Sequence, residues 1–221
     1  MNLNKHLEFF NPTQIKDQIH IIGCGAIGSH LATQLTRIGL SQLHLYDFDT
    51  VEPHNVTNQS YYPDQTGILK VIALRNNLHR INSDSKIHTH TDGYTTQMLN
   101  GHVFLCVDNI ETRLQIATAQ QYNPMIHAFF DFRMRLTDAQ HYAADWINPE
   151  QKERFLQSMQ FSSEEAKEAT PMNACGSTLS IAPTVHGIIA LGIANFINFI
   201  NTQSLKTVIL HDPFHQITDA F

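Results

Sequence analysis

The first residues that could do chemistry form a glycine-rich turn. Gly23, Gly25 and Gly28 stand in the run Gly-Cys-Gly-Ala-Ile-Gly, directly after the apolar residues 19–22. This spacing indicates a strand that turns tightly and opens a helix, in which apolar residues recur at helical spacing. Glycine lets the backbone approach a ligand closely, and the start of a helix presents free N–H groups. The turn therefore predicts a site for a phosphate.

An acidic residue follows at the distance that a nucleotide site needs. Asp47 lies 19 residues after Gly28, at the carboxyl end of a predicted strand over 43–47. On a neighbouring parallel strand, a carboxylate at this position would accept a hydrogen bond from a ribose hydroxyl. Taken alone, the glycine turn and the acid fit nicotinamide, flavin or ATP sites, so the choice between them depends on later residues.

A doubly wound sheet would bring these residues together. The strand 19–22, the helix 26–38 and the strand 43–47 imply a parallel pair with a right-handed crossover. The continuous apolar run 103–107 suits a strand buried on both faces, and it ends at Asp108. The remaining elements are predicted as helices over 66–81, 111–121 and 184–200 and as strands over 86–91, 125–134, 140–147 and 207–210. The predicted fold class is therefore α/β, a Rossmann-like doubly wound sheet that is mainly parallel, with a mixed, antiparallel C-terminal part.

Composition predicts one compact unit and disfavours some partners. The 221 residues, 42% of them hydrophobic, suit a single domain over 1–221, with an N-terminal arm over 1–17 and a mobile crossover segment over 149–175. A net charge of −6 gives no general basic field, so nucleic acid is not expected as the main partner. No secretion signal is evident, and the apolar run 188–200 is short for a bilayer. We therefore expect a cytoplasmic protein with no membrane partner.

Cysteines and histidines predict no metal site. Cys24, Cys106 and Cys175 are widely spaced and form no Cys-x-x-Cys pair, so neither a disulfide framework nor a zinc knuckle is supported. The fourteen histidines include pairs such as His88 and His90, which lack a well-placed third ligand. We interpret Cys24 and Cys106 as packing residues. Cys175 precedes a predicted helix, where a thiol gains thiolate character and could act as a nucleophile, although a free cysteine is often simply a small buried apolar residue.

Four segments in order resemble the ThiF/MoeB and ubiquitin-activating-enzyme adenylation family. They are the glycine turn over 23–28, Asp-Phe-Asp-Thr-Val-Glu-Pro-His-Asn over 47–55, Thr-Gly-Ile-Leu-Lys over 66–70 and Cys-Val-Asp-Asn-Ile-Glu-Thr-Arg over 106–113. The four pieces together are far more specific than any one of them. The resemblance implies adenylation, in which the C-terminal carboxylate of a small protein attacks the α-phosphate of ATP. The products are an acyl adenylate and pyrophosphate.

The resemblance also implies roles for individual residues. The glycines of the turn would cradle the nucleotide, Asp47 would hold its ribose, and Asn55 and Lys70 would lie beside the phosphates. Asp108 is similar to the family's magnesium-associated aspartate, and Asp49 is a second candidate. Lys70 and the metal would stabilise charge on the phosphate oxygens, and the attacking carboxylate needs no base because it is already ionised near neutral pH. The nucleotide-binding candidates are Gly23, Gly25, Ala26, Gly28, Asp47, Asp49, Asn55, Asn58, Lys70, Asp108, Asn109 and Arg113.

Departures from the family pattern bear on activity. Where the family has Asn-Leu-x-Arg-Gln, this chain has Asn-Val-Thr-Asn-Gln, so Asn58 replaces a phosphate-binding arginine. Residues 1–17 contain no arginine that could reach a partner's active site. Arg75 or Arg113 could cover the missing charge, or turnover could be weak or absent. The family's paired-cysteine zinc site is absent as well.

Several features allow two interpretations. Asp108 could bind a metal or cap the following helix, for which aspartate is a preferred N-cap. Arg113 could contact the nucleotide or pair with Asp108 or another nearby acid. The charged segment 151–167 is either a solvated face or, as the family implies, a crossover that clamps the incoming tail. The helix 184–200 is either core or a homodimer interface.

The leading hypothesis is a homodimeric, ATP- and magnesium-dependent enzyme that adenylates a small ubiquitin-like or sulfur-carrier protein. Lys70 and Asp108 would act in adenylation, and Cys175 could then receive the acyl group as a thioester. Two other classes stay open. The glycine turn and Asp47 also suit a nicotinamide-dependent oxidoreductase, and Asn58 with the arginine-free arm suits a non-catalytic nucleotide-binding adaptor. A carboxylate on a peptide or a modified tRNA base remains open as the substrate within the same fold.

Overall fold

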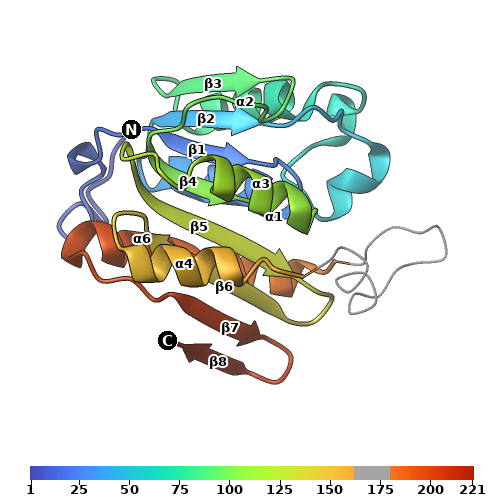
Figure 1. The fold of residues 1–221 in the computed structure, drawn as a ribbon. Helices are drawn as coiled ribbons and strands as arrows, with labels where there is room; N and C mark the ends of the chain where they lie inside the picture. The colour runs from blue at the N-terminus through green and yellow to red at the C-terminus, as the bar shows by residue number, and fades with distance from the viewer. Residues whose placement is uncertain (162–179) are drawn as a thin grey trace.

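The computed structural model describes residues 1–161 and 180–221, in which the strands form one eight-stranded sheet (Figure 1). The strand order is β3-β2-β1-β4-β5-β6-β7-β8. The strands are β1 (Ile19–Ile22), β2 (Gln42–Tyr46), β3 (Lys86–His90), β4 (Gly101–Leu105), β5 (Ile126–Met134), β6 (Ala139–Asp145), β7 (Val208–Asp212) and β8 (Ile217–Ala220).

The sheet has a parallel part and an antiparallel part. Neighbours from β3 to β5 pair in parallel, and neighbours from β5 to β8 pair antiparallel. The chain moves outward from β1 through β2 to β3 and then returns to β4 on the other side of β1. Such a reversal opens a crevice at the carboxyl ends of the strands, where doubly wound proteins bind ligands. The predicted fold class is confirmed.

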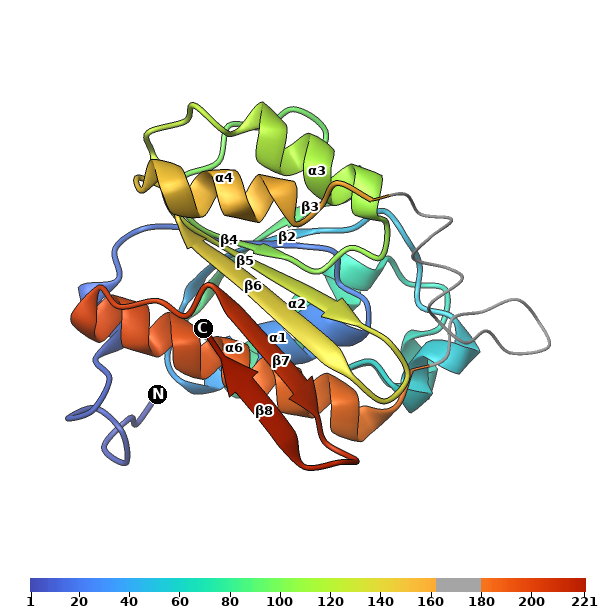
Figure 2. The same cartoon turned by 60° about the horizontal axis from the view of Figure 1, so that its bottom comes forward.

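Helices cover both faces of the sheet (Figure 2). One face carries α1 (Ala26–Arg37), α2 (Lys70–Ile81) and α6 (Ala182–Thr202), and the other carries α3 (Ile110–Ala119) and α4 (Pro149–Gln157). Successive residues of β4 point to opposite faces, because Phe104 belongs to the core under α1 and α6 whereas Val103 and Leu105 belong to the core under α3 and α4. This central strand is therefore buried on both sides, as its apolar run predicts.

The helix α6 is a core element. It is long and apolar enough to span a membrane by length and composition alone, but half of that stretch is buried within the chain. Phe196 packs edge-on against Phe104 and Phe130, with ring centroids 5.4 and 5.5 Å apart. The helix ends at Thr202, and the C-cap residue Gln203 takes a left-handed conformation with φ of 58°. The core interpretation of the predicted helix 184–200 is supported, and the homodimer stays a prediction.

The helix α2 begins four residues later than predicted, at Lys70 instead of residue 66. Gly67 has a φ of +86°, which interrupts any helix that would begin there. The next residues form an isolated antiparallel bridge between Leu69 and Thr50. This bridge ties the loop after β2 to the start of α2, and so it sets where Lys70 begins the helix.

Three further segments can be compared with the prediction: the last strand, the N-terminal arm and the crossover segment. The last strand is β8, which was not predicted, because all four of its residues are exposed and no apolar alternation marks it. Within the arm over 1–17, the regular structure is one 3-10 turn, Pro12–Gln14. In the crossover predicted over 149–175, α4 occupies Pro149–Gln157, and residues 162–175 lie outside the described residues.

Candidate nucleotide site

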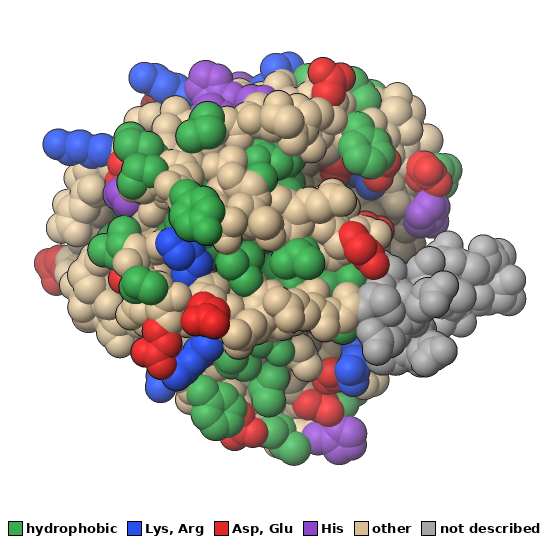
Figure 3. Space-filling model, in the orientation of Figure 1, with side chains coloured by type: hydrophobic (Ala, Val, Ile, Leu, Met, Phe, Trp, Pro, Cys, Tyr) green, Lys and Arg blue, Asp and Glu red, His purple; other side chains and the backbone are tan. Residues whose placement is uncertain are grey.

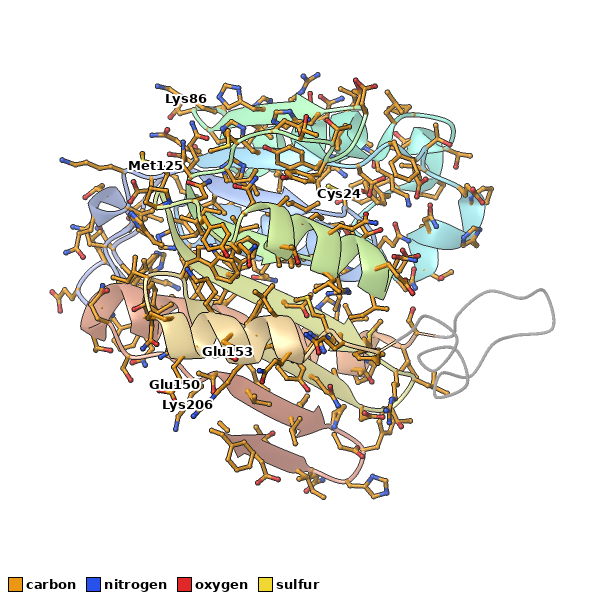
Figure 4. The ribbon with its side chains drawn as sticks, in the orientation of Figure 1. Cys24, Lys86, Met125, Glu150, Glu153 and Lys206 are labelled. Carbon is orange, nitrogen blue, oxygen red and sulfur yellow. The ribbon has the colours of Figure 1, made fainter. Side chains whose placement is uncertain are left out.

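The candidate site lies at the carboxyl ends of β1, β2 and β4. The glycine turn follows β1, Asp47 follows β2, and Asp108 lies shortly after β4. Cys24, within the turn, lies toward this end of the sheet, whereas Lys86 and Met125 lie at the opposite end (Figure 4). The sheet order therefore brings the predicted glycines and the two acids to one edge, at the reversal between β1 and β4.

The three glycines of the turn meet different surroundings. Gly23 has a φ of +95°, and a Cβ there would come within 2.7 Å of the Cys106 backbone. A Cβ on Gly28 would overlap the carbonyl oxygen of Gly23. These two glycines are needed for the tight turn and for the close contact between helix and strand. Around Gly25, by contrast, an added Cβ would meet nothing within 4 Å, so this position leaves room for a ligand to approach the backbone.

The start of α1 is a potential anion site. Gly25 is the N-cap of this helix, and no side chain caps its first N–H groups within the described part of the chain. Uncapped N–H groups and the positive end of the helix dipole favour a bound anion. A hydrogen bond holds the turn in place, because the Tyr61 hydroxyl donates to the carbonyl oxygen of Cys24 at 2.6 Å. Sequence reasoning did not identify Tyr61.

Asp47 lies directly against the glycine turn. Its Oδ2 accepts from the Cys24 N–H at 2.7 Å, and its Oδ1 accepts from the Asp49 N–H at 2.9 Å. Burial raises the pKa of this carboxyl, although these two N–H donors and the nearby charge of Lys70 act in the opposite direction. Each oxygen keeps a lone pair, so Asp47 can accept a further hydrogen bond, and its contact with a ribose stays a prediction.

Lys70 and Asp49 form an ion pair beside the turn. The Lys70 Nζ lies 2.8 Å from Asp49 Oδ2, and the Lys70 backbone N–H donates to the Asp49 carbonyl oxygen at 2.8 Å. Lys70 is only 8% exposed, whereas the Asp49 side chain is half-exposed. Lys70 lies near the turn because its partner Asp49 donates its N–H to Asp47, the acid that contacts the turn. Asp49 holds a lysine here, which weakens its candidacy as a metal ligand.

Asp108 and Asn109 follow β4, and only Asn109 caps the next helix. Asn109 is the N-cap of α3, and its Oδ1 accepts from the Thr112 N–H at 2.8 Å. The capping alternative for Asp108 is therefore wrong. Asp108 is exposed and available to a metal ion, although the metal role itself stays a prediction. The side-chain oxygen of Asn109 caps α3, so it is not left for the nucleotide contact predicted for this residue.

Arg113 does not serve as a free cation for phosphates. It is 6% exposed and forms a buried ion pair with Asp131. It also donates to the carbonyl oxygens of Leu105 and Val107. Asp131 holds Arg133 as well, at 2.6 Å. The alternative in which Arg113 pairs with another nearby acid is the correct one, and the nucleotide role predicted for Arg113 is not supported.

The two asparagines of the loop after β2 hold protein groups in the structure. Asn55 is buried, and its Oδ1 accepts from the Glu52 N–H at 2.9 Å. Asn58 donates through Nδ2 to the Ser180 hydroxyl. A role for either residue beside phosphates would need these contacts to change, so both stay predictions. Near Asn58, sequence reasoning missed His30, whose pKa is lowered to about 4 by burial and by the adjacent His186.

Arg75 faces another part of the molecule. It lines a pocket of about 460 Å³ together with Asn76, His79, Ser85, Lys86, Ile87 and His88. Figure 3 shows basic and histidine side chains gathered along the edge over β3. This pocket lies at the start of β3, the end of the sheet away from the glycine turn. Arg75 therefore does not replace the arginine that the family has at Asn58.

The cysteines do not supply a nucleophile in the described part of the chain. Cys24 and Cys106 are free and buried, and burial raises the pKa of both thiols. Their interpretation as packing residues is supported. The predicted nucleophile Cys175 lies outside the described residues.

The fold and the site together define a doubly wound α/β protein in which an uncapped helix start and an acid on the next strand meet at the switch point. The model of the ThiF family matches residues 14–218, and the chain belongs to this family.

Individual relatives agree with the family. Ubiquitin-like modifier-activating enzyme 5 of Caenorhabditis briggsae is 36% identical over 124 residues, which cover 48% of this chain and 29% of that protein. The Drosophila virilis enzyme of the same name is 36% identical over 142 residues, covering 56% of this chain and 34% of that protein. The aligned regions therefore span about a third of these curated relatives.

Solved structures share the fold at low identity. A crystal structure of E. coli MccB with ATP has a TM-score of 0.73 at 16% identity, covering 95% of this chain and 65% of that one. A structure of PaaA has a TM-score of 0.73 at 14% identity, covering 99% of this chain and 68% of that one.

Proposed function

We propose that this chain is an ATP-dependent adenylyltransferase that activates a carboxylate on a small ubiquitin-like or sulfur-carrier protein or on a peptide. One observation carries the proposal. The start of α1 is uncapped and open at Gly25, with the carboxylate of Asp47 directly beside it. This arrangement suits a phosphate and a ribose of the same nucleotide.

Lys70 would supply positive charge to the phosphates. Its ammonium is held beside the turn by Asp49 before ATP binds, and a phosphate oxygen could take over from that carboxylate. Such an exchange costs little reorganisation, because the lysine stem is already buried in position. Charge that is already oriented in the site is the main way in which proteins stabilise phosphoryl-type transition states.

A magnesium ion fits the remaining acid. Magnesium is usually held by one or two carboxylates together with substrate phosphates, so a single exposed aspartate at the strand end suffices. Asp108 is exposed and is not the helix cap, which leaves its carboxylate for such an ion. The ion would neutralise phosphate charge. The substrate carboxylate needs no general base because it is ionised near neutral pH.

The relatives support a carboxylate substrate on a protein or a peptide. The names of the curated relatives describe enzymes that activate a ubiquitin-like modifier. One neighbouring crystal structure holds E. coli MccB with AMPCPP and MccA, at a TM-score of 0.74 and 17% identity. Transfer of the acyl group to Cys175 and assembly as a homodimer remain parts of this proposal without support from the described residues.

The test is ATP–pyrophosphate exchange in the presence of ubiquitin-like and sulfur-carrier proteins from the same organism. We expect exchange with one carrier and none with the same carrier made with a C-terminal amide, because the amide removes the nucleophile. Asp108→Ala should abolish exchange, whereas Asp84→Ala, which removes an exposed acid before β3, should not. Saturable binding of NADH without binding of ATP would contradict the proposal and favour an oxidoreductase.

A second candidate is a non-catalytic adaptor that binds ATP. The observation that favours it is the buried ion pair of Arg113 with Asp131. Because Arg113 is held there, it does not supply the positive charge that is missing at Asn58. Tight binding of ATP without exchange for any carrier would select the adaptor.

A further inference from the structure

A second group of potential ligands lies at the opposite end of the sheet from the glycine turn. Asp17 precedes β1, His102 is the second residue of β4, and His127 is the second residue of β5. Their potential ligand atoms all lie within 4.8 Å of one another. Met125, which directly precedes β5, marks this end in Figure 4. These residues take no part in the proposed nucleotide site.

His102 carries an unexplained polar atom. Its side chain is 2% exposed, and its Nδ1 is buried without a hydrogen-bond partner. A buried polar atom in a native protein almost always has a partner, so this one needs an explanation such as a bound ion or water.

A bulge brings His127 to the same place. Gly101 pairs with Ile126 and His102 pairs with Ala128, so the register skips His127. A bulge of this kind re-aims a side chain that regular alternation would send to the other face. The rings of His102 and His127 lie edge to face, with centroids 5.4 Å apart. Bulges are rare between parallel strands, which makes this one a specific feature of the site.

Asp17 comes close to the start of β4 because position 101 is a glycine. Gly101 has a φ of +70°, and a Cβ there would overlap the carbonyl oxygen of Gln18 and come within 2.8 Å of the Asp17 Cβ. The His102 N–H donates to the same Gln18 oxygen at 3.0 Å. A side chain at position 101 would therefore push the chain before β1 away from β4.

An ordinary surface ion pair explains only part of this arrangement. The His127 Nδ1 lies 3.4 Å from Asp17 Oδ2, with both side chains about half-exposed. The exposed pair of His215 and Asp212 is similar, at 2.7 Å. That second pair has no third ligand among the described residues, whereas a potential ligand atom of the buried His102 lies within 4.8 Å of those of both members of the first pair.

We propose that Asp17, His102 and His127 bind one divalent transition-metal ion, with Zn²⁺ as the best match to two imidazoles and a carboxylate. Zinc binds such ligands tetrahedrally, and three protein ligands leave the fourth position for water or an incoming group. Magnesium and calcium prefer oxygen ligands and suit the site less well.

The ligand atoms need a small closure around the metal. Metal–ligand bonds of about 2.0–2.2 Å place neighbouring tetrahedral ligands about 3.3–3.6 Å apart, less than the 4.8 Å limit within which these atoms lie. Asp17 is exposed and belongs to the arm before β1, so its side chain can move while the two strands stay fixed. The bound ion would clamp the arm to the starts of β4 and β5.

The test uses the whole chain, stripped with a chelator and dialysed, and titrated calorimetrically with zinc chloride. We expect one Zn²⁺ per chain. Asp17→Asn and His127→Gln, two exposed positions, should each weaken binding by at least about 10–100-fold, the cost typical of changes around a metal site. His215→Gln removes the histidine of the comparison pair and should leave the affinity unchanged. Co²⁺ in place of Zn²⁺ should give the strong visible bands of a tetrahedral site.

Two results would overturn the proposal. One is the absence of stoichiometric binding by the wild-type chain. The other is a loss of affinity that is the same in His127→Gln and His215→Gln, which would indicate weak binding to surface histidines in general. Melting temperatures measured in chelator must match the wild type for the two exposed variants, so that a loss of affinity is not a loss of fold.

Discussion

Gly25→Val separates the role of the glycine turn in folding from its role in binding. An added Cβ at Gly25 meets nothing within 4 Å, so a side chain finds space there, although the ψ of −145° lies outside the regions that residues with side chains usually adopt. The same change at Gly28 would drive a Cβ into the carbonyl oxygen of Gly23. We therefore expect Gly25→Val to fold and to lose ATP, because its side chain fills the space through which a phosphate reaches the N–H groups of α1.

The effects on folding and on binding are measured separately. Valine is a poor N-cap, which costs about 1 kcal/mol, and a side chain at the ψ of −145° adds strain of about 1–3 kcal/mol. The melting temperature without ligand should therefore fall by about 4–16 °C, and the ATP-induced rise is measured from that lower value. In the wild type, ATP at about 100 times its Kd stabilises by about 2.7 kcal/mol. For a chain of this size that is a rise of about 5–11 °C, which Gly25→Val should lose.

The assay is thermal unfolding with and without Mg-ATP. Gln34→Val places the same side chain on the exposed face of α1, and it should keep the full ligand-induced rise. Gly28→Ala should lower the melting temperature even without ligand, because overpacking against backbone costs about 1–3 kcal/mol or more. A Gly25→Val protein that keeps the whole ATP-induced rise would refute the assigned route of approach.

Two further predictions concern buried charge. Arg113→Met leaves the carboxylate of Asp131 with one partner fewer in a buried setting, and it should cost about 3–5 kcal/mol in urea unfolding while the Kd for ATP of the folded protein stays unchanged. His141 is fully buried with its pKa lowered to about 4, so between pH 6.5 and 4 the unfolded chain binds the extra proton. His141 alone should contribute up to about 3 kcal/mol to the fall in the free energy of unfolding across that range, beside contributions of the same sign from other buried histidines such as His20 and His30, and His141→Asn should flatten this part of the curve; an unchanged slope would contradict the assignment.

Local patterns were enough to predict the sheet and the glycine turn. In the parallel half, β1 and β4 carry buried, mostly apolar runs and β2 and β3 alternate, and parallel strands place their carboxyl ends at one edge. For this reason the meeting of Gly25, Asp47 and Asp108 could be predicted from residues that are far apart in the sequence. The start of α2 was predicted too early, because the apolar stripe continues through Ile68 and the left-handed conformation of Gly67 has no signature in periodicity.

Side-chain contacts that depend on the register between strands could not be predicted from the sequence. Asp131 lies opposite Leu105 in the pairing of β4 with β5, which brings it beneath the helix that carries Arg113. The available signal was an acid inside the apolar run of β5, since a charge buried in a strand needs a partner. The group of Asp17, His102 and His127 depends on a bulge, and a one-residue shift of register has no mark in the sequence.

The distribution of positive charge predicts an unusual dependence on the metal. The family pattern has an arginine where this chain has Asn58, and Arg113 is occupied by Asp131, so Lys70 and the start of α1 are the cationic groups that we assign to the phosphates. Each missing charge-assisted contact leaves more phosphate charge to a divalent ion.

Asn58→Arg should therefore lower the Mg²⁺ concentration needed for half-maximal ATP binding. Thr57→Arg, an exposed neighbour, tests whether any added charge nearby has the same effect. The measurement is a magnesium titration of ATP affinity in the three proteins at constant ionic strength, because screening alone weakens exposed charges. If Asn58→Arg changes nothing, or if Thr57→Arg lowers the requirement equally, position 58 does not face the phosphates. In that case the role of Asn58 is structural: its hydrogen bond to Ser180 joins the loop after β2 to the segment that leads into α6.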